Sequence, residues 1–248
     1  MSYETMKVGS EAGVTTVWFT RPEVRNAVSM QFCLDLAAVF DELAWDDQTR
    51  VVLLRGEDPV FCAGADLKER EGWDEVQLRR RRLVGKEAFQ KVVNCPKPVL
   101  ASVQGAAVGA GAELALIADF SYAAQGTIFR WPEVVWGSVG ATQRLARRVG
   151  KAHAKELLFT GATIDAQEAA RLGIVNKVFP ADELGDASVA TAQDIAQRLP
   201  ITLGETKRAI DVGTEVPLTI GLEIERAGVE IGMRSDEWRQ GIDAFTQR

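Results

Sequence analysis

Two glutamates in the middle of the chain, Glu113 and Glu133, have surroundings that suit acid–base chemistry. Glu113 lies three residues after Ala110 on an expected helix, and the residues that follow it are apolar. Glu133 follows an expected short strand at 127–131. Two carboxyls can add water to a conjugated double bond, because one activates the water while the other protonates the α-carbon. Taken singly, Glu113 could only complement a helix dipole, and Glu133 could be a solvated turn residue.

Two segments rich in glycine and alanine each lead into an expected helix, and both could present backbone N–H groups to a negatively charged oxygen. They cover residues 63–67 and 108–114. Backbone N–H groups at a helix start stabilise an oxyanion without titrating. The small side chains of Ala65 and Ala110 would let a ligand approach the main chain closely. Each segment, taken alone, is also typical of an ordinary tight turn.

The pattern around these segments predicts alternating strands and helices. Apolar runs at 14–19, 51–54 and 98–103 predict short strands, and the last two are each followed by one of the glycine-rich segments. From Ser29, which suits an N-cap, apolar residues recur at helical spacing as far as Leu43. That stretch therefore predicts a helix with one buried face.

The C-terminal part of the chain is expected to be mainly helical. Asp165 and Glu168 form the pattern of a capping box, and a strand at 174–179 is expected after that helix. Beyond Asp182 the helical pattern continues almost to the end. The sequence thus predicts a β-rich core and a C-terminal helical region, at 1–190 and 191–248.

Composition limits the expected partners and location. The chain has 248 residues, of which 46% are hydrophobic, and a formal charge of −6 from interspersed acidic and basic residues. Interspersed charge argues against a nucleic-acid partner. Cys33, Cys62 and Cys95 have neither the spacing of a metal site nor the density of a disulfide scaffold. We expect no membrane partner, because no apolar run is long enough to span a bilayer, and a cytoplasmic protein with reduced cysteines.

Other conspicuous residues are weaker candidates. The arginine run at 79–82 could meet a nucleotide phosphate, but a solvated helix face is the more common role of such a run. His153 is the only histidine and sits in a helical stretch, which argues against a general base. No serine lies in a GxSxG elbow, and no cluster of His, Cys and acidic residues indicates a metal.

Taken together, these residues resemble the enoyl-CoA hydratase/isomerase, or crotonase, family. The resemblance spans about residues 10–235, and several motifs occur in the family's order. The matching segments are Arg21-Pro22, 25–28, 61–68, 103–114, Pro132-Glu133, 142–145 and Thr160-Gly161 with 173–176.

The resemblance implies an α/β fold, a crotonase-like spiral of ββα turns with a C-terminal helical region used in trimerisation. It therefore implies a homotrimer or a homohexamer. By the same resemblance, the N–H groups of Ala65 and Ala110 form an oxyanion hole, and Glu113 and Glu133 are the catalytic acids. The implied reaction is enoyl-CoA hydratase chemistry, the reversible syn addition of water to a 2-enoyl-CoA thioester in fatty acid metabolism.

The resemblance also implies where coenzyme A binds. The main chain at 63–67, with Ala63, Gly64, Asp66 and Leu67, would hold the adenine and pantetheine, and Arg25 would lie near the phosphates. Coenzyme A is then part of the acyl-CoA substrate, and no separate cofactor and no metal are expected.

Three departures from the family pattern fall near the expected acyl group. Ala110 replaces the usual glycine, although alanine keeps the N–H. The segment 137–141 after Glu133 is shorter than usual and lacks its proline, and Arg130 with Trp131 precede Pro132 where a small residue is usual at position 130. These departures point to a modified acyl end of the pocket.

Three other functions remain open on the sequence alone. A double-bond isomerase would use Glu133 as its only base and need no water. An acyl-CoA hydrolase or a C–C bond hydrolase could use the same fold, because fold does not fix chemistry. A catalytically silent scaffold or an RNA-binding relative is the non-enzyme alternative, against which both acids and the negative net charge count.

Overall fold

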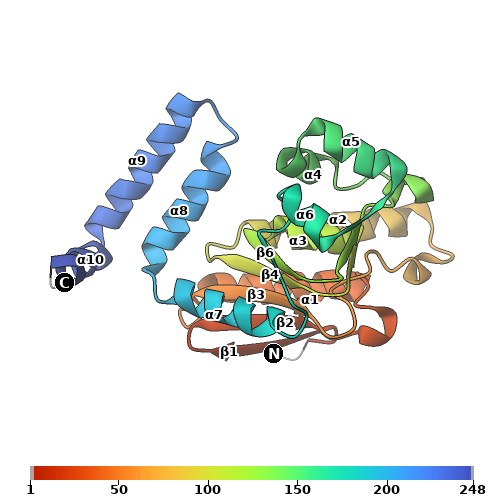
Figure 1. Cartoon of the computed structure of the whole chain (residues 1–248), viewed down its shortest axis with the longest axis horizontal. Helices are drawn as coiled ribbons and strands as arrows, with labels where there is room; N and C mark the ends of the chain where they lie inside the picture. Colours follow the sequence, from red (N-terminus) through yellow and green to blue (C-terminus); the bar gives the residue numbers. More distant parts are fainter. Residues whose placement is uncertain (1–2, 247–248) are drawn as a thin grey trace.

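The computed structural model describes residues 3–246. A six-stranded sheet forms the centre of the molecule (Figure 1). The strand order is β1-β2-β3-β4-β6-β9, in which β1 is antiparallel to β2 and every later pair is parallel. The strands of this sheet are β1 (Met6–Glu11), β2 (Val14–Phe19), β3 (Val51–Gly56), β4 (Val99–Val103), β6 (Phe120–Ala124) and β9 (Lys177–Phe179).

The three predicted apolar runs form the inner strands β2, β3 and β4. Val14 pairs with Val51, and Val52 pairs with Val99. All five residues of β4 are buried, as expected for a parallel strand covered on both faces. Alternate residues of β3 enter different core clusters, since Val52 and Leu54 pack on one side of the sheet and Val51 and Leu53 on the other.

Helices cover both faces of this sheet. The predicted helix after Ser29 is α1 (Met30–Trp45), and its N-cap is confirmed because the Ser29 hydroxyl accepts a hydrogen bond from the Phe32 N–H at 3.1 Å. The Phe32 ring packs against Phe19 of β2, with centroids 4.9 Å apart. On the opposite face, α7 (Leu184–Ala196) packs its buried residues against β3 and β4.

A second, three-stranded sheet and a group of short helices complete the core. Its order is β5-β7-β8, and an isolated bridge from Cys62 to Ala107 of β5 joins the loop after β3 to it. The remaining core elements are η1 (Pro22–Val24), η2 (Lys68–Arg70), α2 (Glu75–Val93), β5 (Ala106–Val108), α3 (Ala110–Ile117), β7 (Ile128–Arg130), η3 (Glu133–Trp136), α4 (Thr142–Val149), α5 (Lys151–Thr160), β8 (Thr163–Asp165) and α6 (Ala166–Arg171).

The last three helices stand to one side of the sheets (Figure 1). They are α8 (Pro200–Gly213), α9 (Leu218–Arg234) and α10 (Asp236–Thr246), and α8 packs along α9. Lys207 joins α8 to the core through an ion pair with Asp119 at 3.0 Å and a hydrogen bond to the Lys97 carbonyl at 3.2 Å. Because α7 crosses residue 190 while packed on the sheet, the helical extension visible in Figure 1 begins at α8. The division at 190 stays a prediction.

Two local predictions are corrected around α6. The Asp165 carboxylate caps the Glu168 N–H, but the Glu168 side chain pairs with Arg171 rather than closing a capping box. The predicted strand at 174–179 pairs only over 177–179. Its first part is a bend, because the Ile174 N–H bonds back to the Ala169 carbonyl at 2.8 Å.

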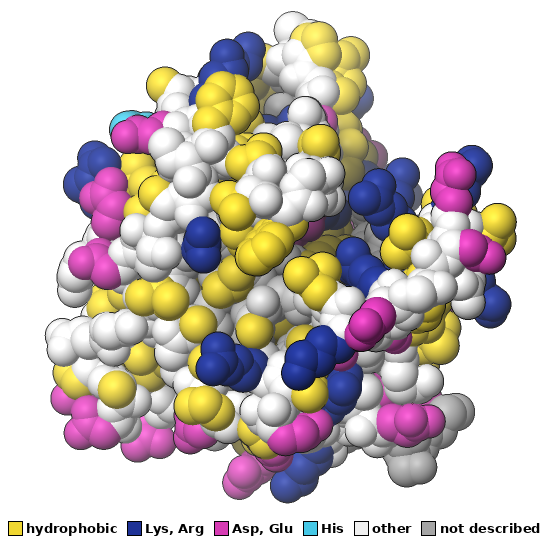
Figure 2. All heavy atoms as spheres, turned by 90° about the vertical axis from the view of Figure 1, so that its right-hand side faces the viewer, with side chains coloured by type: hydrophobic (Ala, Val, Ile, Leu, Met, Phe, Trp, Pro, Cys, Tyr) yellow, Lys and Arg dark blue, Asp and Glu magenta, His cyan; other side chains and the backbone are white. Residues whose placement is uncertain are grey.

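The surface mixes charged and apolar side chains. On the face drawn in Figure 2, basic and acidic groups lie among apolar ones rather than in a single charged field. Among residues 3–246, no helix is both long and apolar enough to cross a bilayer.

Candidate active site

The four residues predicted to carry the chemistry line one cleft. Ala65, Ala110, Glu113 and Glu133 all border a hollow with a volume of about 360 Å³. They come from three segments far apart in sequence, namely the loop after β3, the start of α3 and the start of η3. The structure therefore brings together the two proposed N–H donors and the two carboxyls, which sequence spacing alone could not establish.

Both proposed donors have N–H groups that the surrounding backbone leaves free. Ala110 is the first residue of α3, so its N–H has no acceptor within the helix. Ala65 forms a parallel bridge with Val28. In that bridge the Val28 N–H bonds to the Gly64 carbonyl at 2.8 Å and the Asp66 N–H to the Val28 carbonyl at 3.1 Å. The Ala65 N–H therefore points away from Val28, as strand geometry requires.

Two glycines let the segments that carry these donors touch. A Cβ added at Gly111 would lie 2.1 Å from the Cys62 carbonyl oxygen, and one added at Gly64 would lie 2.5 Å from the Val108 oxygen. The Val108 N–H also donates to the Cys62 carbonyl at 3.0 Å. The same Cβ added at Gly64 would lie 3.7 Å from the Ala110 nitrogen. The two donors thus face the cleft from main chains in direct contact, which only glycine permits.

Glu113 is the charged residue of α3, and its carboxylate has a specific partner. The other residues from Gly111 to Ile117 are buried, whereas Glu113 turns toward the cleft on the same helix face as Ala110. Its Oε1 accepts a short, charge-assisted hydrogen bond from Nη1 of Arg144 on α4. The sequence contained Arg144 within a family motif, but gave no signal that its side chain reaches Glu113.

Glu133 is the first residue of η3, and it is partly buried. Burial raises the pKa of Glu133, and the nearby charge of Glu113 acts in the same direction. One carboxylate oxygen, Oε2, is buried without a hydrogen-bond partner. Gly109 and Gly140 leave room for this side chain, since a Cβ at Gly140 would lie 3.0 Å from Glu133 Cγ. The surroundings favour a carboxyl that holds a proton and can donate it.

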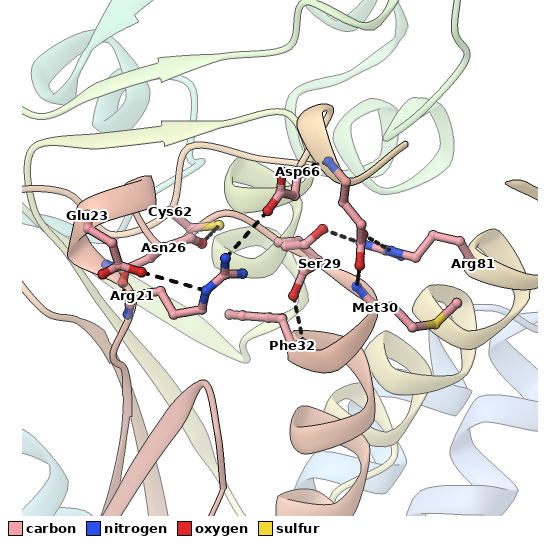
Figure 3. A network of polar contacts seen from close by, with 11 residues as sticks. Arg21, Glu23, Asn26, Ser29, Met30, Phe32, Cys62, Asp66 and Arg81 are labelled. Atoms are coloured by element: carbon pink, nitrogen blue, oxygen red, sulfur yellow. Dashed lines mark hydrogen bonds and ion pairs between the residues drawn. The ribbon is translucent and has the colours of Figure 1, made fainter. Parts of the chain in front are cut away.

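The arginine run at 79–82 is largely the expected solvated helix face, because Arg79, Arg80 and Arg82 are exposed, and only the buried Arg81 departs from that expectation. Arg81 is only 5% exposed, and its Nη2 donates to the Val28 carbonyl at 2.6 Å. Its Nε lies 3.7 Å from Glu69, whose other oxygen accepts from the Met30 N–H at 2.7 Å. Figure 3 shows Arg81 reaching toward the start of α1. Arg82 also lines the cleft.

The residues predicted to hold coenzyme A lie beside the cleft rather than in its lining. The Ala63 N–H donates to the Arg25 carbonyl at 3.0 Å. Asp66 pairs with Arg21 at 3.6 Å (Figure 3). Leu67 is 54% exposed. The structure therefore keeps this loop next to Ala65. A contact between any of these residues and coenzyme A stays a prediction.

The departures from the family pattern divide into structural and cleft positions. Trp131 is fully buried, and the Arg130 Nε donates to the Gly161 carbonyl at 2.7 Å, so neither side chain lines the cleft. Residues 138–141 of the shortened segment do line it.

His153 is about half exposed, with Glu156 at 4.0 Å. Within 3–246 there is no group of three or more His, Cys, Asp or Glu placed to hold a metal.

The α/β architecture thus gathers the main chain of Ala65 and Ala110 and the carboxyls of Glu113 and Glu133 around one cleft. A family profile described as enoyl-CoA hydratase/isomerase matches residues 9–248. The chain belongs to the enoyl-CoA hydratase/isomerase family.

Individual relatives agree with this assignment. The human "Enoyl-CoA hydratase domain-containing protein 2, mitochondrial" is 38% identical over 97% of this chain and 85% of its own length. The Arabidopsis thaliana "Probable enoyl-CoA hydratase 2, mitochondrial" is 34% identical over 97% of this chain and 81% of its own length. The crystal structure of an enoyl-CoA hydratase from Bacillus anthracis superposes with a TM-score of 0.96 at 33% identity, covering 98% and 96% of the two chains. The predicted crotonase-like fold with C-terminal helices is confirmed.

Proposed function

We propose that this protein is an enoyl-CoA hydratase that adds water reversibly to a 2-enoyl-CoA thioester. The observation that carries the proposal is the presence of two carboxyls and two free main-chain N–H groups in one cleft. The N–H groups of Ala65 and Ala110 would bind the thioester oxygen and stabilise the enolate that forms there. An isolated oxyanion hole would serve many reactions, whereas the second carboxyl is what hydration specifically needs.

The two carboxyls have complementary roles in the proposed step. Glu113 accepts a proton from water while the water oxygen bonds to the β-carbon of the enoyl group. The electron pair of the double bond moves toward the thioester, and the α-carbon takes the proton that Glu133 holds. The net change is addition of one water, and proton exchange with solvent restores both carboxyls. The raised pKa of Glu133 suits its role as the proton donor.

Exchange of each carboxyl for its amide tests this mechanism. Glu113→Gln and Glu133→Gln keep the shape of the side chain but remove proton transfer, and each should lower kcat for hydration on the order of 10²-fold or more. The double variant should be only slightly worse than the poorer single variant, because the two groups act together. A folded Glu113→Gln protein that hydrates at the wild-type rate would refute the two-carboxyl mechanism.

The same variants separate the proposed hydratase from a double-bond isomerase. An isomerase would lose conversion of a 3-enoyl-CoA to a 2-enoyl-CoA in Glu133→Gln, yet keep most of it in Glu113→Gln. A hydrolase of either kind would release products that mass spectrometry distinguishes from the 3-hydroxyacyl thioester. A silent scaffold or an RNA-binding relative would bind no acyl-CoA in a calorimetric titration.

Coenzyme A is proposed as part of the substrate, with no separate cofactor. The loop with Ala63, Gly64, Asp66 and Leu67 would hold its adenine and pantetheine, and Arg25 would lie near its phosphates. Thioesters should then bind far more tightly than the corresponding free acids, because distant contacts position the reacting carbonyl. Equal affinity for an acid and its thioester would contradict this assignment.

We also propose that the protein is a homotrimer or a pair of trimers. Large apolar side chains on α9 and α10 are exposed in the single chain, among them Ile220, Met233, Trp238, Ile242 and Phe245. Such a surface is usually covered by symmetric association. Light scattering that gives the mass of one 27.0 kDa chain at micromolar concentration would rule this out.

A cytoplasmic location is retained as a proposal, to be tested by fractionation and imaging.

A further inference from the structure

The cleft that holds the two glutamates is lined by more cations than its own acids can pair. Its basic residues are Arg70, Arg81, Arg82, Lys86 and Arg144. Arg81 pairs with Glu69, and Arg144 pairs with Glu113. Among the residues that the structure describes, no carboxylate oxygen lies within 4.0 Å of the charged nitrogens of Arg70, Arg82 or Lys86.

Two of these three cations, Arg82 and Lys86, lie on helix α2 and line the cleft. Gly85 and Lys86 lie three and four residues after Arg82, and Phe89 lies four and three residues after them, so these residues share one helix face, and all four line the cleft. A Cβ added at Gly85 would lie 2.6 Å from Nη1 of Arg81, so glycine leaves room for that guanidinium beside the cleft. Phe89 and its neighbours on the buried face hold the helix against the core. The position of this charged face is therefore fixed by packing.

The third cation is partly withdrawn from water and still lacks a partner. Arg70 lies at the end of η2, and its Nε is buried without a hydrogen bond. Burial lowers the pKa of Arg70, the charge of Arg81 lowers it further, and the Glu69 carboxylate acts in the opposite direction. The Nε of Arg81 is likewise buried without a hydrogen bond. Crowding of like charges with unused donors is unfavourable unless an anion completes the arrangement.

The location of these cations indicates which part of a bound thioester they would contact. They share a cleft with Ala65 and Ala110, whose N–H groups are proposed to bind the thioester carbonyl. In any acyl-CoA, the long pantetheine arm separates that carbonyl from the nucleotide phosphates. Groups beside the carbonyl therefore meet the acyl chain. An acyl chain that ended in a methyl group would leave all three cations unpaired.

Building on the proposed hydratase function, we propose that the substrate is a 2-enoyl-CoA thioester whose acyl group carries a second, free carboxylate remote from the thioester. Arg70, Arg82 and Lys86 form the site that receives this carboxylate. Guanidinium groups match a carboxylate in a two-pronged geometry, and an ammonium group adds charge. The cations thereby serve as specificity-determining residues, separate from the carboxyls that move protons.

A ratio of specificity constants tests this proposal. The substrates are 2-enoyl-CoA thioesters of graded chain length, each made with a terminal carboxylate and with a terminal methyl group. The wild-type protein should favour the carboxylate member at the matching length. In Arg82→Gln/Lys86→Gln, the ratio of kcat/KM for carboxylate over methyl substrate should fall about 10- to 100-fold, as expected on losing charge-assisted contacts. Both positions are exposed, which lets the variant fold.

The same helix offers a matched control. Arg79 is exposed on α2 but does not line the cleft, so Arg79→Gln removes one charge from the helix without changing the proposed site. Its substrate ratio should equal that of the wild type. If the double variant also kept the wild-type ratio, the proposed carboxylate site would be wrong even though hydration itself continued.

Two further outcomes would overturn the proposal in other ways. An equal loss with both substrates would assign the cations to the coenzyme A phosphates, which the two substrates share. A changed mass in light scattering would assign them to a contact between subunits. If the wild type hydrated neither substrate, the proposed function would fail. Calorimetric titration with the two saturated thioesters would then test the carboxylate site alone, because preference for the carboxylate member should survive loss of turnover.

Discussion

Replacing Gly111 with alanine should displace the proposed oxyanion donors without changing either carboxyl. A methyl group at this position would lie 2.1 Å from the Cys62 carbonyl oxygen and 2.8 Å from its carbonyl carbon. A carbon and an oxygen that are not bonded approach to roughly 3.3 Å. The start of α3 and the loop before Ala65 must therefore separate by about 1 Å, which carries the Ala110 N–H away from its partner donor.

The displacement of the Ala110 N–H determines the expected loss in the rate of hydration. An N–H displaced by this distance no longer reaches an oxyanion held by the other donor. Loss of one such donor costs on the order of 10²- to 10³-fold in kcat, or roughly 3–4 kcal/mol in the activation barrier. Overpacking costs about 1–3 kcal/mol of folding free energy, which is less than the stability of a typical domain. We therefore expect a folded Gly111→Ala protein with severely reduced turnover.

Hydration is measured by loss of the absorbance of the conjugated thioester, and folding by thermal denaturation. Gly232→Ala in α9 is the matched control, because an added Cβ there meets no heavy atom within 4 Å. Affinity for a saturated acyl-CoA should change much less than kcat, since most of the proposed contacts are with the nucleotide and pantetheine. A folded Gly111→Ala protein with the kcat of the wild type would refute the proposed geometry of the donors.

Three further predictions concern the carboxyls and the core. Because the pKa of Glu133 is raised in the folded protein, stability should fall as pH rises from the unfolded value of about 4.3 through the folded one, and Glu133→Gln should remove this decline in denaturant titrations. Arg144→Gln frees the Glu113 carboxylate and should lower kcat for hydration about 10-fold, with little change in affinity for a saturated acyl-CoA. Asp35→Ala leaves the Thr5 N–H and hydroxyl without their acceptor and should cost about 2–3 kcal/mol in urea unfolding.

Each of these predictions has an outcome that contradicts it. Parallel stability curves against pH for Glu133→Gln and wild type would mean that burial of this carboxyl carries no penalty. A fall in acyl-CoA affinity as large as the fall in kcat would make Arg144 a binding residue rather than one that positions Glu113. Unchanged unfolding of Asp35→Ala would show that water replaces the lost acceptor.

The sequence predicted most accurately those helices and strands that are specified by residues within their own segments. The helix after Ser29 follows from an N-cap and a regular apolar stripe, and both lie within the segment itself. The inner strands follow from apolar runs that are buried on both faces. The strand expected at 174–179 is shorter because Ile174 bonds to the previous helix and Asn176 bonds to Ser121. Those bonds depend on distant partners that local pattern does not reveal.

The placement of residues around the cleft was predictable in part for the same reason. Ala110 and Glu113 lie three residues apart, so helical geometry places them on one face before the fold is known. Their meeting with Glu133 depends on how η3 packs, and sequence alone left it open. Arg81 was expected to be solvated because a run of arginines usually is. Its burial depends on Glu69 and on the Val28 carbonyl, which only the folded chain brings near.

Helix α2 separates the residues that hold it against the core from the residues that line the cleft, and this separation affects how the protein can evolve. The residues that fix the helix to the core, such as Ala88 and Val92, are fully buried, whereas Arg82 and Lys86 are exposed at the rim of the cleft. The proposed oxyanion donors are main-chain groups and tolerate changes in side chain. Substitutions at 82 and 86 can therefore alter which acyl groups are accepted at small cost to folding. On the proposed assignment, new substrate preferences are accessible by single substitutions at this rim, while the two proposed proton-transferring carboxyls stay unchanged.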